Sequence, residues 1–156
     1  IHDDTRVFTR SGFTYETFQK SLFALHALSI KVIVHLILGL PHETREMMSA
    51  SVQAIENLPV WGIKLQLLHV LSGTDLAAYY EKTHFPVFSM DEYCEMIIDC
   101  LELLPPEMVI HRITGDGPKD LLIAPMWSTG KRTVLNQIHR RLKERNTYQG
   151  RLATKR

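Results

Sequence analysis

The chain has 156 residues, of which 45% are hydrophobic, and its formal net charge at pH 7 is +1. That length suffices for one domain with a buried core, and the near-neutral balance excludes a uniformly acidic or basic protein. No apolar run approaches the ~20 residues of a membrane-spanning helix, and no secretory signal is visible. The sequence therefore predicts neither membrane association nor secretion. Because it begins at Ile1, we expect it to be part of a longer protein.

The predicted elements, in chain order, alternate between helices and strands. Apolar stripes at helical spacing predict helices near residues 14–29, 44–57, 76–82, 91–104 and 131–145. Apolar runs predict strands at residues 31–38, 62–70 and 108–113. Repeated strand–helix units favour an α/β fold with parallel strands and helices on the outer face only. The first helix would bury Phe18, Leu22, Leu25 and Leu28.

Two cysteines, Cys94 and Cys100, stand six residues apart in a helical pattern. This spacing matches neither a metal-binding CxxC pair nor a disulfide framework, and it is typical of a reducing, cytoplasmic location. We expect two ordinary helix cysteines.

Basic residues gather at the C-terminal end. Residues 131–156 contain nine Lys or Arg and one acid, whereas residues 1–130 contain nine Lys or Arg and sixteen acids. A basic segment can bind phosphate, which makes RNA one expected partner, or it can be a solvated helix with a frayed end. We therefore divide the chain into residues 1–130 and a C-terminal helix with a basic tail, residues 131–156.

The most informative segment is the strand Val32–Leu38 and the turn Gly39-Leu40-Pro41 that follows it. Glycine removes the side chain where the backbone turns tightly or approaches a ligand, and Pro41 ends the strand before a helix. Ligands of α/β proteins bind at the carboxyl ends of strands. This turn is therefore the first candidate for a functional site.

Polar side chains alternate along the next predicted strand. Lys64 and Gln66 stand between Ile63, Leu65 and Leu67, so one face of the strand is apolar and the other polar. In a barrel the polar face lines the lumen, which makes Lys64 and Gln66 candidates to bind a substrate. Alternatively, Lys64 simply reaches solvent.

His35, His69 and His111 lie on three successive predicted strands. Three converging histidines can bind a metal, but Asp and Cys partners at ligand spacing are missing, so we predict no metal site. His69 and His111, near strand ends, are instead candidates for a polar pocket.

After the last strand, residues 114–118 (TGDGP) combine the Asp116 carboxylate with free backbone amides. This segment could bind a cation or a ribose, or it could form an ordinary turn.

Four segments carry a family resemblance: VHLILGLPHET (34–44), LLHVLSGTDL (67–76), HRITGDGPKDLLIAPMW (111–127) and TYQG (147–150). Together they resemble the C-terminal half of a radical S-adenosylmethionine (radical SAM) protein. The similar family is an uncharacterised bacterial one, related to the elongator-type acetyltransferase and oxygen-independent coproporphyrinogen dehydrogenase groups.

The resemblance implies half of a partial (βα) TIM-like barrel that uses S-adenosylmethionine and a [4Fe-4S] cluster. A separate electron donor would reduce this cluster. These cofactors would generate a 5′-deoxyadenosyl radical in a closed cavity. The cluster-binding cysteines belong to the N-terminal half, so this chain alone should be inactive. The resemblance identifies no catalytic residue and no substrate. It implies cofactor contacts at Ile37, Gly39, Leu40, Pro41, Leu68, His69 and Val70. The candidate substrate-pocket residues are Lys64, Gln66, His111, Arg112 and Asp116.

Two sites depart from the family pattern. His42 stands where glycine is usual, and Ser11-Gly12-Phe13 stands where an Arg-Gly-His run is usual.

Two other functions compete with the radical SAM interpretation. One is an RNA-binding module that uses the basic tail, and the other is a non-radical α/β barrel enzyme with a polar pocket around His69 and His111.

Overall fold

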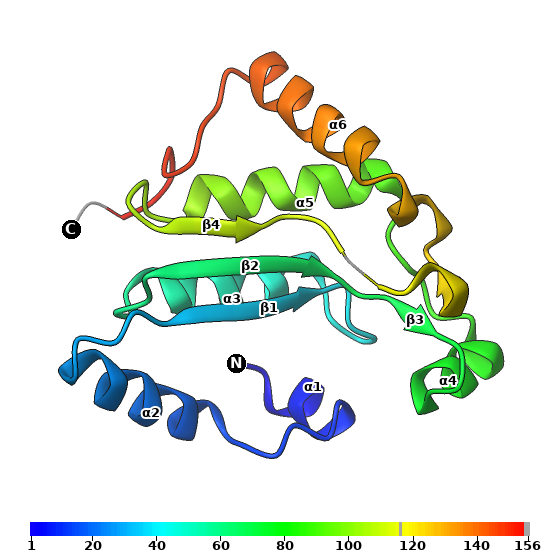
Figure 1. Ribbon diagram of the computed structural model, residues 1–156, viewed down its shortest axis with the longest axis horizontal. Coiled ribbons are helices and arrows are strands. Elements are labelled where there is room, and N and C mark those ends of the chain that lie inside the picture. The colour runs from blue at the N-terminus through cyan, green and yellow to red at the C-terminus, as the bar shows by residue number, and fades with distance from the viewer. Residues whose placement is uncertain (116, 155–156) are drawn as a thin grey trace.

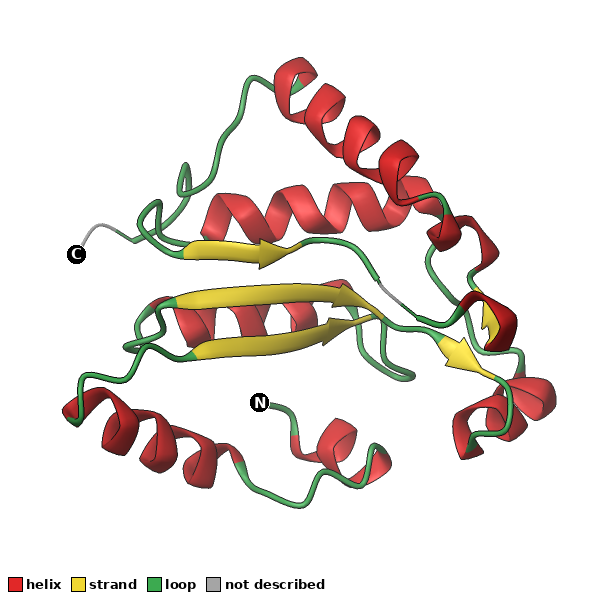
Figure 2. Cartoon of the chain, in the orientation of Figure 1, coloured by secondary structure: helices red, strands yellow, loops and turns green. Residues whose placement is uncertain are grey.

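A computed structural model describes residues 1–115 and 117–154. Figures 1 and 2 show its helices and strands. The elements are α1 (Asp3–Phe8), α2 (Tyr15–Ala27), β1 (Ile33–Leu38), α3 (Arg45–Glu56), β2 (Gly62–Leu67), β3 (Val70–Leu71), α4 (Asp75–Thr83), α5 (Met90–Leu103), β4 (Val109–Arg112), β5 (Leu122–Ala124) and α6 (Lys131–Glu144), with 3-10 turns at Lys119–Leu121 and Met126–Thr129.

The main sheet has three parallel strands in the order β1-β2-β4. Helices α3 and α5 lie on one side of it, behind the strands in Figure 1, and α6 packs beyond α5. The register pairs Leu38 with Leu67, so β1 and β2 end at the same edge. The predicted α/β half-barrel with parallel strands and outer helices is confirmed.

The core lies between the sheet and α3 and α5. On β2, Ile63, Leu65 and Leu67 point into it and are at most 2% exposed, whereas Lys64 and Gln66 face the other way. The helices bury the stripes expected from their periodicity. These are Met48, Ser51, Val52 and Ile55 on α3, Tyr93, Met96, Ile97, Cys100 and Leu101 on α5, and Val134 and Ile138 on α6.

The predicted strand at 62–70 is wrong after Leu67, in its last three residues. After β2 ends at Leu67, the amide of Leu68 donates to the carbonyl of Leu38 (2.9 Å). The chain then leaves the sheet, and β3 pairs antiparallel with β5 in a separate two-stranded sheet. A continuous apolar run predicts burial, but it does not indicate that the chain changes partner within the run.

The predicted core face of α2 is also largely wrong. Leu22 is buried, but Leu25 is 37% and Leu28 72% exposed. Figure 1 shows α2 beyond β1, at the edge of the sheet, where the described residues offer little surface to pack against. Helix α1 was not predicted, because six residues are too few for a periodic pattern. In the described part of the chain, no helix is long and apolar enough to cross a membrane.

Candidate functional site

The two turn segments singled out by sequence lie side by side at the carboxyl edge of the sheet. Gly39-Leu40-Pro41 follows β1, and Leu68-His69-Val70 follows β2, joined by the hydrogen bond from Leu68 to Leu38. Helix α3 begins directly after the first turn, where Thr44 caps it by accepting from the Met47 amide. Parallel strands thus bring the two segments to one edge, as expected.

Gly39 has two structural reasons to be glycine. Its φ is +87°, in the left-handed region that side chains rarely adopt. A Cβ there would also lie 2.9 Å from Cδ2 of Phe88. The amide of Gly39 donates to the sulfur of Met48 (3.2 Å), which fixes the turn against α3. The space beside this backbone is therefore filled by protein.

His42 also adopts a left-handed conformation, with φ of +68°. A side chain in this conformation costs about 1 kcal/mol or more, which accounts physically for the glycine that the resemblance leads us to expect here. Here the side chain gains contacts of its own. Its Nε2 lies 3.0 Å from the Tyr79 hydroxyl, and its ring meets the Phe8 ring edge-on at 5.5 Å. His42 therefore links the turn after β1 to α1 and α4.

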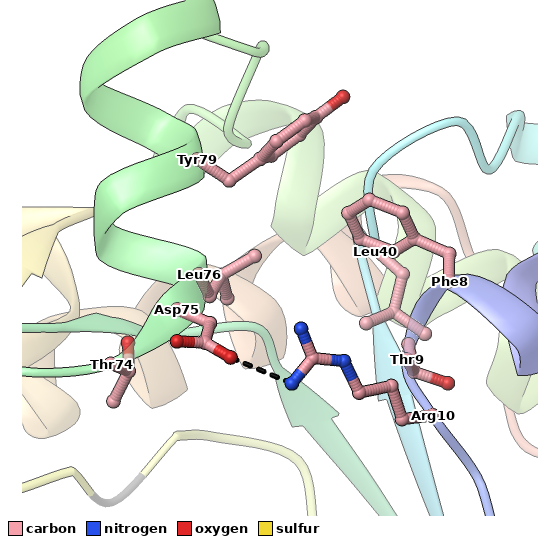
Figure 3. A pocket seen from close by; sticks show the side chains of 8 residues that line it. All are labelled: Phe8, Thr9, Arg10, Leu40, Thr74, Asp75, Leu76 and Tyr79. Atoms are coloured by element: carbon pink, nitrogen blue, oxygen red, sulfur yellow. Dashed lines mark hydrogen bonds and ion pairs between the residues drawn. The ribbon is translucent and has the colours of Figure 1, made fainter.

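A cavity of about 500 Å³ opens beside this turn, between the end of α1 and the start of α4 (Figure 3). An exposed ion pair crosses it, from Arg10 Nη1 to Asp75 Oδ2 at 2.7 Å. Of the predicted cofactor residues only Leu40 lines this cavity. Its lining consists of Phe8, Thr9, Arg10, Leu40, Thr74, Asp75, Leu76 and Tyr79.

The other predicted cofactor residues differ in how accessible they are. Ile37 is 37% exposed on the open face of the sheet, beside Gln66 of β2. Leu68 and Val70 are buried in a second apolar cluster with Phe85 and Ala124, and Val70 has no exposed surface. Pro41 is buried as well. Any ligand at this edge would therefore meet the side chains of Ile37, Leu40 and His69 before those of Pro41, Leu68 and Val70.

The Gly-x-Gly turn after β4 encloses the ring of His69. A Cβ on Gly115 would lie 2.3 Å from the ring's Cε1 and Nε2, and one on Gly117 would lie 2.6 Å from Nδ1. The φ of Gly115 is not positive, so the close approach of His69 explains that glycine. Asp116, a predicted pocket residue, lies outside the described residues.

The predicted substrate-pocket residues follow the open face of the sheet. His35 and Gln66 are joined by a hydrogen bond of 2.7 Å between Nε2 and Oε1. The register places Lys64 opposite His35 on one side and Arg112 on the other, next to a β-bulge. His111 packs edge-on against Trp61 at 5.3 Å. Within the described residues, no three His, Cys, Asp or Glu side chains form a group suited to a metal.

Glu43 was not identified from the sequence, although it follows Gly39 and Pro41 in the same turn. It lines a cavity of about 290 Å³ between α1, α2 and β1, together with His2 and Thr5. Burial raises the pKa of the Glu43 carboxyl, although a hydrogen bond with Thr5 and the nearby His2 oppose the shift. A carboxylate two residues after the proline of a Gly-x-Pro turn was the available signal.

The raised pKa of Glu43 gives a stability prediction. Since its pKa is higher in the folded chain, the folded state holds the proton more tightly, and the free energy of unfolding falls as pH rises above the unfolded pKa. Glu43→Gln should therefore raise the free energy of unfolding slightly at pH 7, with the gain shrinking toward pH 4. Denaturant titrations across pH 4–8 measure this difference. Glu81→Gln, on the exposed face of α4, is the control, and a destabilised Glu43→Gln at pH 7 contradicts the prediction.

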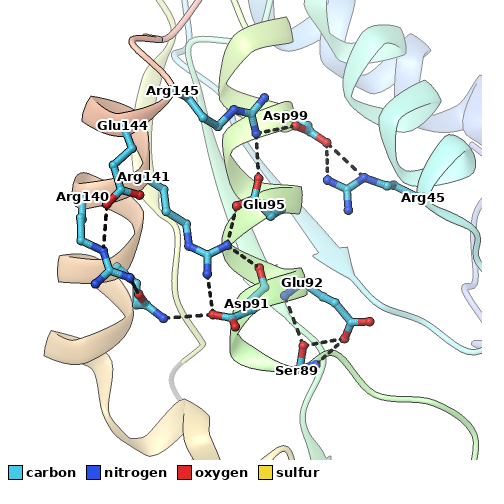
Figure 4. Close-up of polar contacts among 11 residues, drawn as sticks. Arg45, Ser89, Asp91, Glu92, Glu95, Asp99, Arg140, Arg141, Glu144 and Arg145 are labelled. Carbon is cyan, nitrogen blue, oxygen red and sulfur yellow. Dashed lines mark hydrogen bonds and ion pairs between the residues drawn. The ribbon is translucent and has the colours of Figure 1, made fainter.

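Two arginines at the end of α6, Arg141 and the C-cap residue Arg145, point toward the acids of α5 (Figure 4). Arg141 pairs with Asp91 and Glu95, and Arg145 pairs with Asp99 (3.0 Å) as well as with Glu95 and Glu102. These pairs compensate part of the positive charge counted in the sequence. Less charge is therefore available to RNA than the count suggested.

The segment after α6 is docked along the loop between α5 and β4. The side-chain amide of Gln149 donates to the carbonyls of Pro105 (2.7 Å) and Met108 (2.8 Å). The amides of Gly150 and Leu152 donate to the carbonyls of Leu101 and Glu102. The alternative of a frayed end is therefore wrong as far as Thr154, and Lys155 and Arg156 lie outside the described residues.

A parallel sheet with helices on one face, polar side chains on the other and turns meeting at its carboxyl edge defines this chain as half of a (βα) barrel. Residues 60–144 match the model of the radical SAM C-terminal domain, which covers more than half of the chain. The chain belongs to this family. The resemblance found in the sequence is confirmed.

Relatives and a solved structure agree with this assignment. The chain is 41% identical over 150 residues to the uncharacterized protein YtqA of Bacillus subtilis, covering 96% of this chain and 47% of YtqA. It is 30% identical to the uncharacterized protein MJ0486 of Methanocaldococcus jannaschii, with the same coverage. The chain thus spans about half the length of these relatives. The structure of Methanocaldococcus infernus Elp3 matches the fold with a TM-score of 0.82, at 18% identity, over 96% of this chain and 35% of Elp3.

Proposed function

We propose that this chain forms the C-terminal half of the barrel of a radical SAM enzyme and contributes one wall of its S-adenosylmethionine site. The observation that carries the proposal is the meeting of the Gly39–Pro41 and Leu68–Val70 segments at one sheet edge, in a chain of this family. When bound, S-adenosylmethionine and a [4Fe-4S] cluster supply a 5′-deoxyadenosyl radical that takes hydrogen from a substrate.

The cavity beside Leu40 suits the adenosine part of S-adenosylmethionine. Phe8 and Tyr79 offer aromatic surface, Leu40 and Leu76 offer aliphatic surface, and Asp75 offers a carboxylate that can accept from hydroxyl groups. About 500 Å³ lies within the range of small-molecule sites. These residues would hold the nucleoside and exclude water from it, while Gly39 and Pro41 keep the turn in place.

The cysteines of this chain do not fit the cluster. Cys94 and Cys100 are fully buried on α5, where they are free thiols packed in the core. Burial raises the pKa of Cys100 to about 12, whereas cluster ligands are thiolates. The cluster's ligands would therefore come from outside this chain. Buried free thiols are also compatible with the reducing, cytoplasmic location that we propose.

The open face of the sheet would meet the substrate. Lys64 and Gln66 occupy alternate positions on β2, facing away from the helices, and the register pairs Lys64 with Arg112 of β4. In this proposal they bind polar groups of an unidentified substrate, and an electron donor reduces the cluster. RNA remains a possible partner only through the charge that the α5 acids leave uncompensated.

The test uses the full-length protein, purified without oxygen. We expect about four irons per chain with a broad absorbance near ~400 nm, whereas the 156-residue chain alone should be colourless. We also expect saturable binding of S-adenosylmethionine by calorimetry, weakened roughly tenfold by Leu40→Asp and little changed by Leu152→Asp, an exposed position in the docked C-terminal segment. An iron-free full-length protein would favour the non-radical barrel enzyme. Equal affinities of the two variants would remove the cavity from the site.

A further inference from the structure

His42 occupies a strained position in the turn between β1 and α3. The amide of Glu43 donates to the carbonyl of Leu40 (3.1 Å), with Pro41 and His42 between them. Proline at the second position and a left-handed residue at the third, here with φ of +68°, are the features of a type II turn. Glycine or asparagine normally fills that third position, because other side chains are strained there. The turn itself therefore gives no reason for a histidine.

The other left-handed residues of the chain have a simpler explanation. In its described part, four of the five non-glycine residues with a positive φ stand at or just after the end of a helix, where this conformation is common. These are Arg10 after α1, Ser29 after α2, His84 at the end of α4 and Asn146 after α6. His42 instead precedes a helix, so its strain needs another reason.

The contacts of the His42 side chain contribute little to folding. The residue is exposed, and water competes for its hydrogen bond with the Tyr79 hydroxyl (3.0 Å). Backbone strain that folding does not require is typical of ligand clamps and other functional positions. We therefore examined which residues His42 holds in place.

Three aromatic rings from three elements meet at His42. Its ring lies edge-on to that of Phe8 on α1, with 5.5 Å between the centroids, and 6.3 Å from the ring of Tyr79 on α4. The Phe8 and Tyr79 rings are 5.1 Å apart. Both of them line the cavity beside Leu40 (Figure 3), whereas His42 is not one of its lining residues. His42 thus contacts two walls of the cavity from outside it.

These two walls belong to elements that need such a contact. Helix α1 has six residues, which is too few for a helix to be stable alone. Helix α4 packs with β3 and β5 in the second apolar cluster, apart from the main core. The ion pair that also joins them, Arg10 with Asp75, is exposed at both ends and therefore weak. His42 connects both walls to the turn that is fixed at the edge of the main sheet.

We propose that His42 is a positioning residue of the S-adenosylmethionine site, which holds the Phe8 and Tyr79 rings in place before the nucleoside binds. This inference rests on the proposed function, because it takes the cavity beside Leu40 as the adenosine site. Side chains that are already ordered lose less freedom when a ligand binds. His42 therefore increases affinity, although its backbone does not favour folding.

Calorimetry with S-adenosylmethionine on the full-length protein, purified without oxygen, tests this role. His42→Gly relieves the left-handed strain and removes the ring, so binding should weaken roughly fivefold while the midpoint of urea denaturation stays unchanged or rises. His42→Phe keeps a ring but also the strain, so it should bind more tightly than His42→Gly although it unfolds at a lower urea concentration. Affinity and stability then change in opposite directions, which a purely structural role would not produce.

His84→Gly is the matched control. His84 is also an exposed histidine with a left-handed backbone (φ of +45°), but it ends α4 outside the cavity lining. Glycine should suit this helix end, and affinity for S-adenosylmethionine should stay within about twofold of that of the unaltered protein. Circular dichroism establishes that each variant is folded.

The outcomes separate this inference from the proposed function. If Leu40→Asp weakens binding but His42→Gly does not, the adenosine site stands and the role of His42 is overturned. That role is also overturned if His84→Gly weakens binding as much as His42→Gly, or if both His42 variants lose affinity in step with stability. No binding by the unaltered protein, or unchanged binding by Leu40→Asp, would overturn the adenosine site and this inference together.

Discussion

Replacing Gly39 with valine is expected to lower the free energy of unfolding by more than about 3 kcal/mol. A φ of +87° costs a side chain about 1–2 kcal/mol, and a β-branched one more. The added carbons would also meet the Phe88 ring, which lies 2.9 Å from the Cβ position, and overpacking of this kind costs about 1–3 kcal/mol. Urea denaturation followed by circular dichroism measures the loss.

Gly12→Val is the control for this experiment, because no atom lies within 4 Å of its Cβ position and its φ is not in the left-handed range. It should cost less than about 1 kcal/mol. If the two variants are equally stable, the turn after β1 does not require glycine. The family resemblance implied a cofactor contact at Gly39, but the structure places Phe88 beside it. A loss of cofactor affinity in Gly39→Val would therefore not by itself identify a contact.

The main sheet could be predicted because its strands obey simple periodicities. Ile63, Leu65 and Leu67 alternate with Lys64 and Gln66. This pattern correctly places the apolar side chains on the face that packs against the helices and the polar ones on the open face of the sheet. The small sheet of β3 and β5 could not be predicted. It depends on a pairing between residues about 50 positions apart, within segments of two or three residues that are too short for any period.

The candidate site was predicted only where it follows the strands. Leu40 was found because ligands bind at strand ends, but Phe8 and Arg10 belong to a short helix and the turn after it, which carry no sequence signal. Tyr79 was assigned to a helix without a role, and Asp75 lay just before that helix. Their convergence depends on how α1 and α4 pack around the turn, which local patterns do not determine.

The positive charge of the C-terminal helix was counted without the carboxylates of α5 that pair with it. The acids of α5 stand at positions 91, 95, 99 and 102, which is one helical stripe, and Arg141 and Arg145 form a matching pair one turn apart. These two patterns were both visible in the sequence. Matching stripes on consecutive amphipathic helices would have predicted the ion-pair network and reduced the charge assigned to RNA binding.

The last prediction concerns the contact between Gly115 and His69. Gly115→Ala is expected to lower the free energy of unfolding by about 1–3 kcal/mol, because its Cβ would lie 2.3 Å from two atoms of the His69 ring. Since the φ of Gly115 is not positive, alanine itself suits the backbone, and the cost should come from the ring alone.

A double-mutant cycle isolates that cost. A His69→Ala background removes the three atoms nearest to the added methyl group, so Gly115→Ala should then cost less than about 0.5 kcal/mol, which leaves a coupling energy above about 1 kcal/mol. Gly12→Ala, measured in both backgrounds, should show no coupling, because nothing surrounds it. An equal cost of Gly115→Ala with and without His69 would mean that the turn needs glycine for its own backbone. The coupled result would instead establish that the turn after β4 holds the His69 ring at the carboxyl edge of β2, next to the proposed cofactor site.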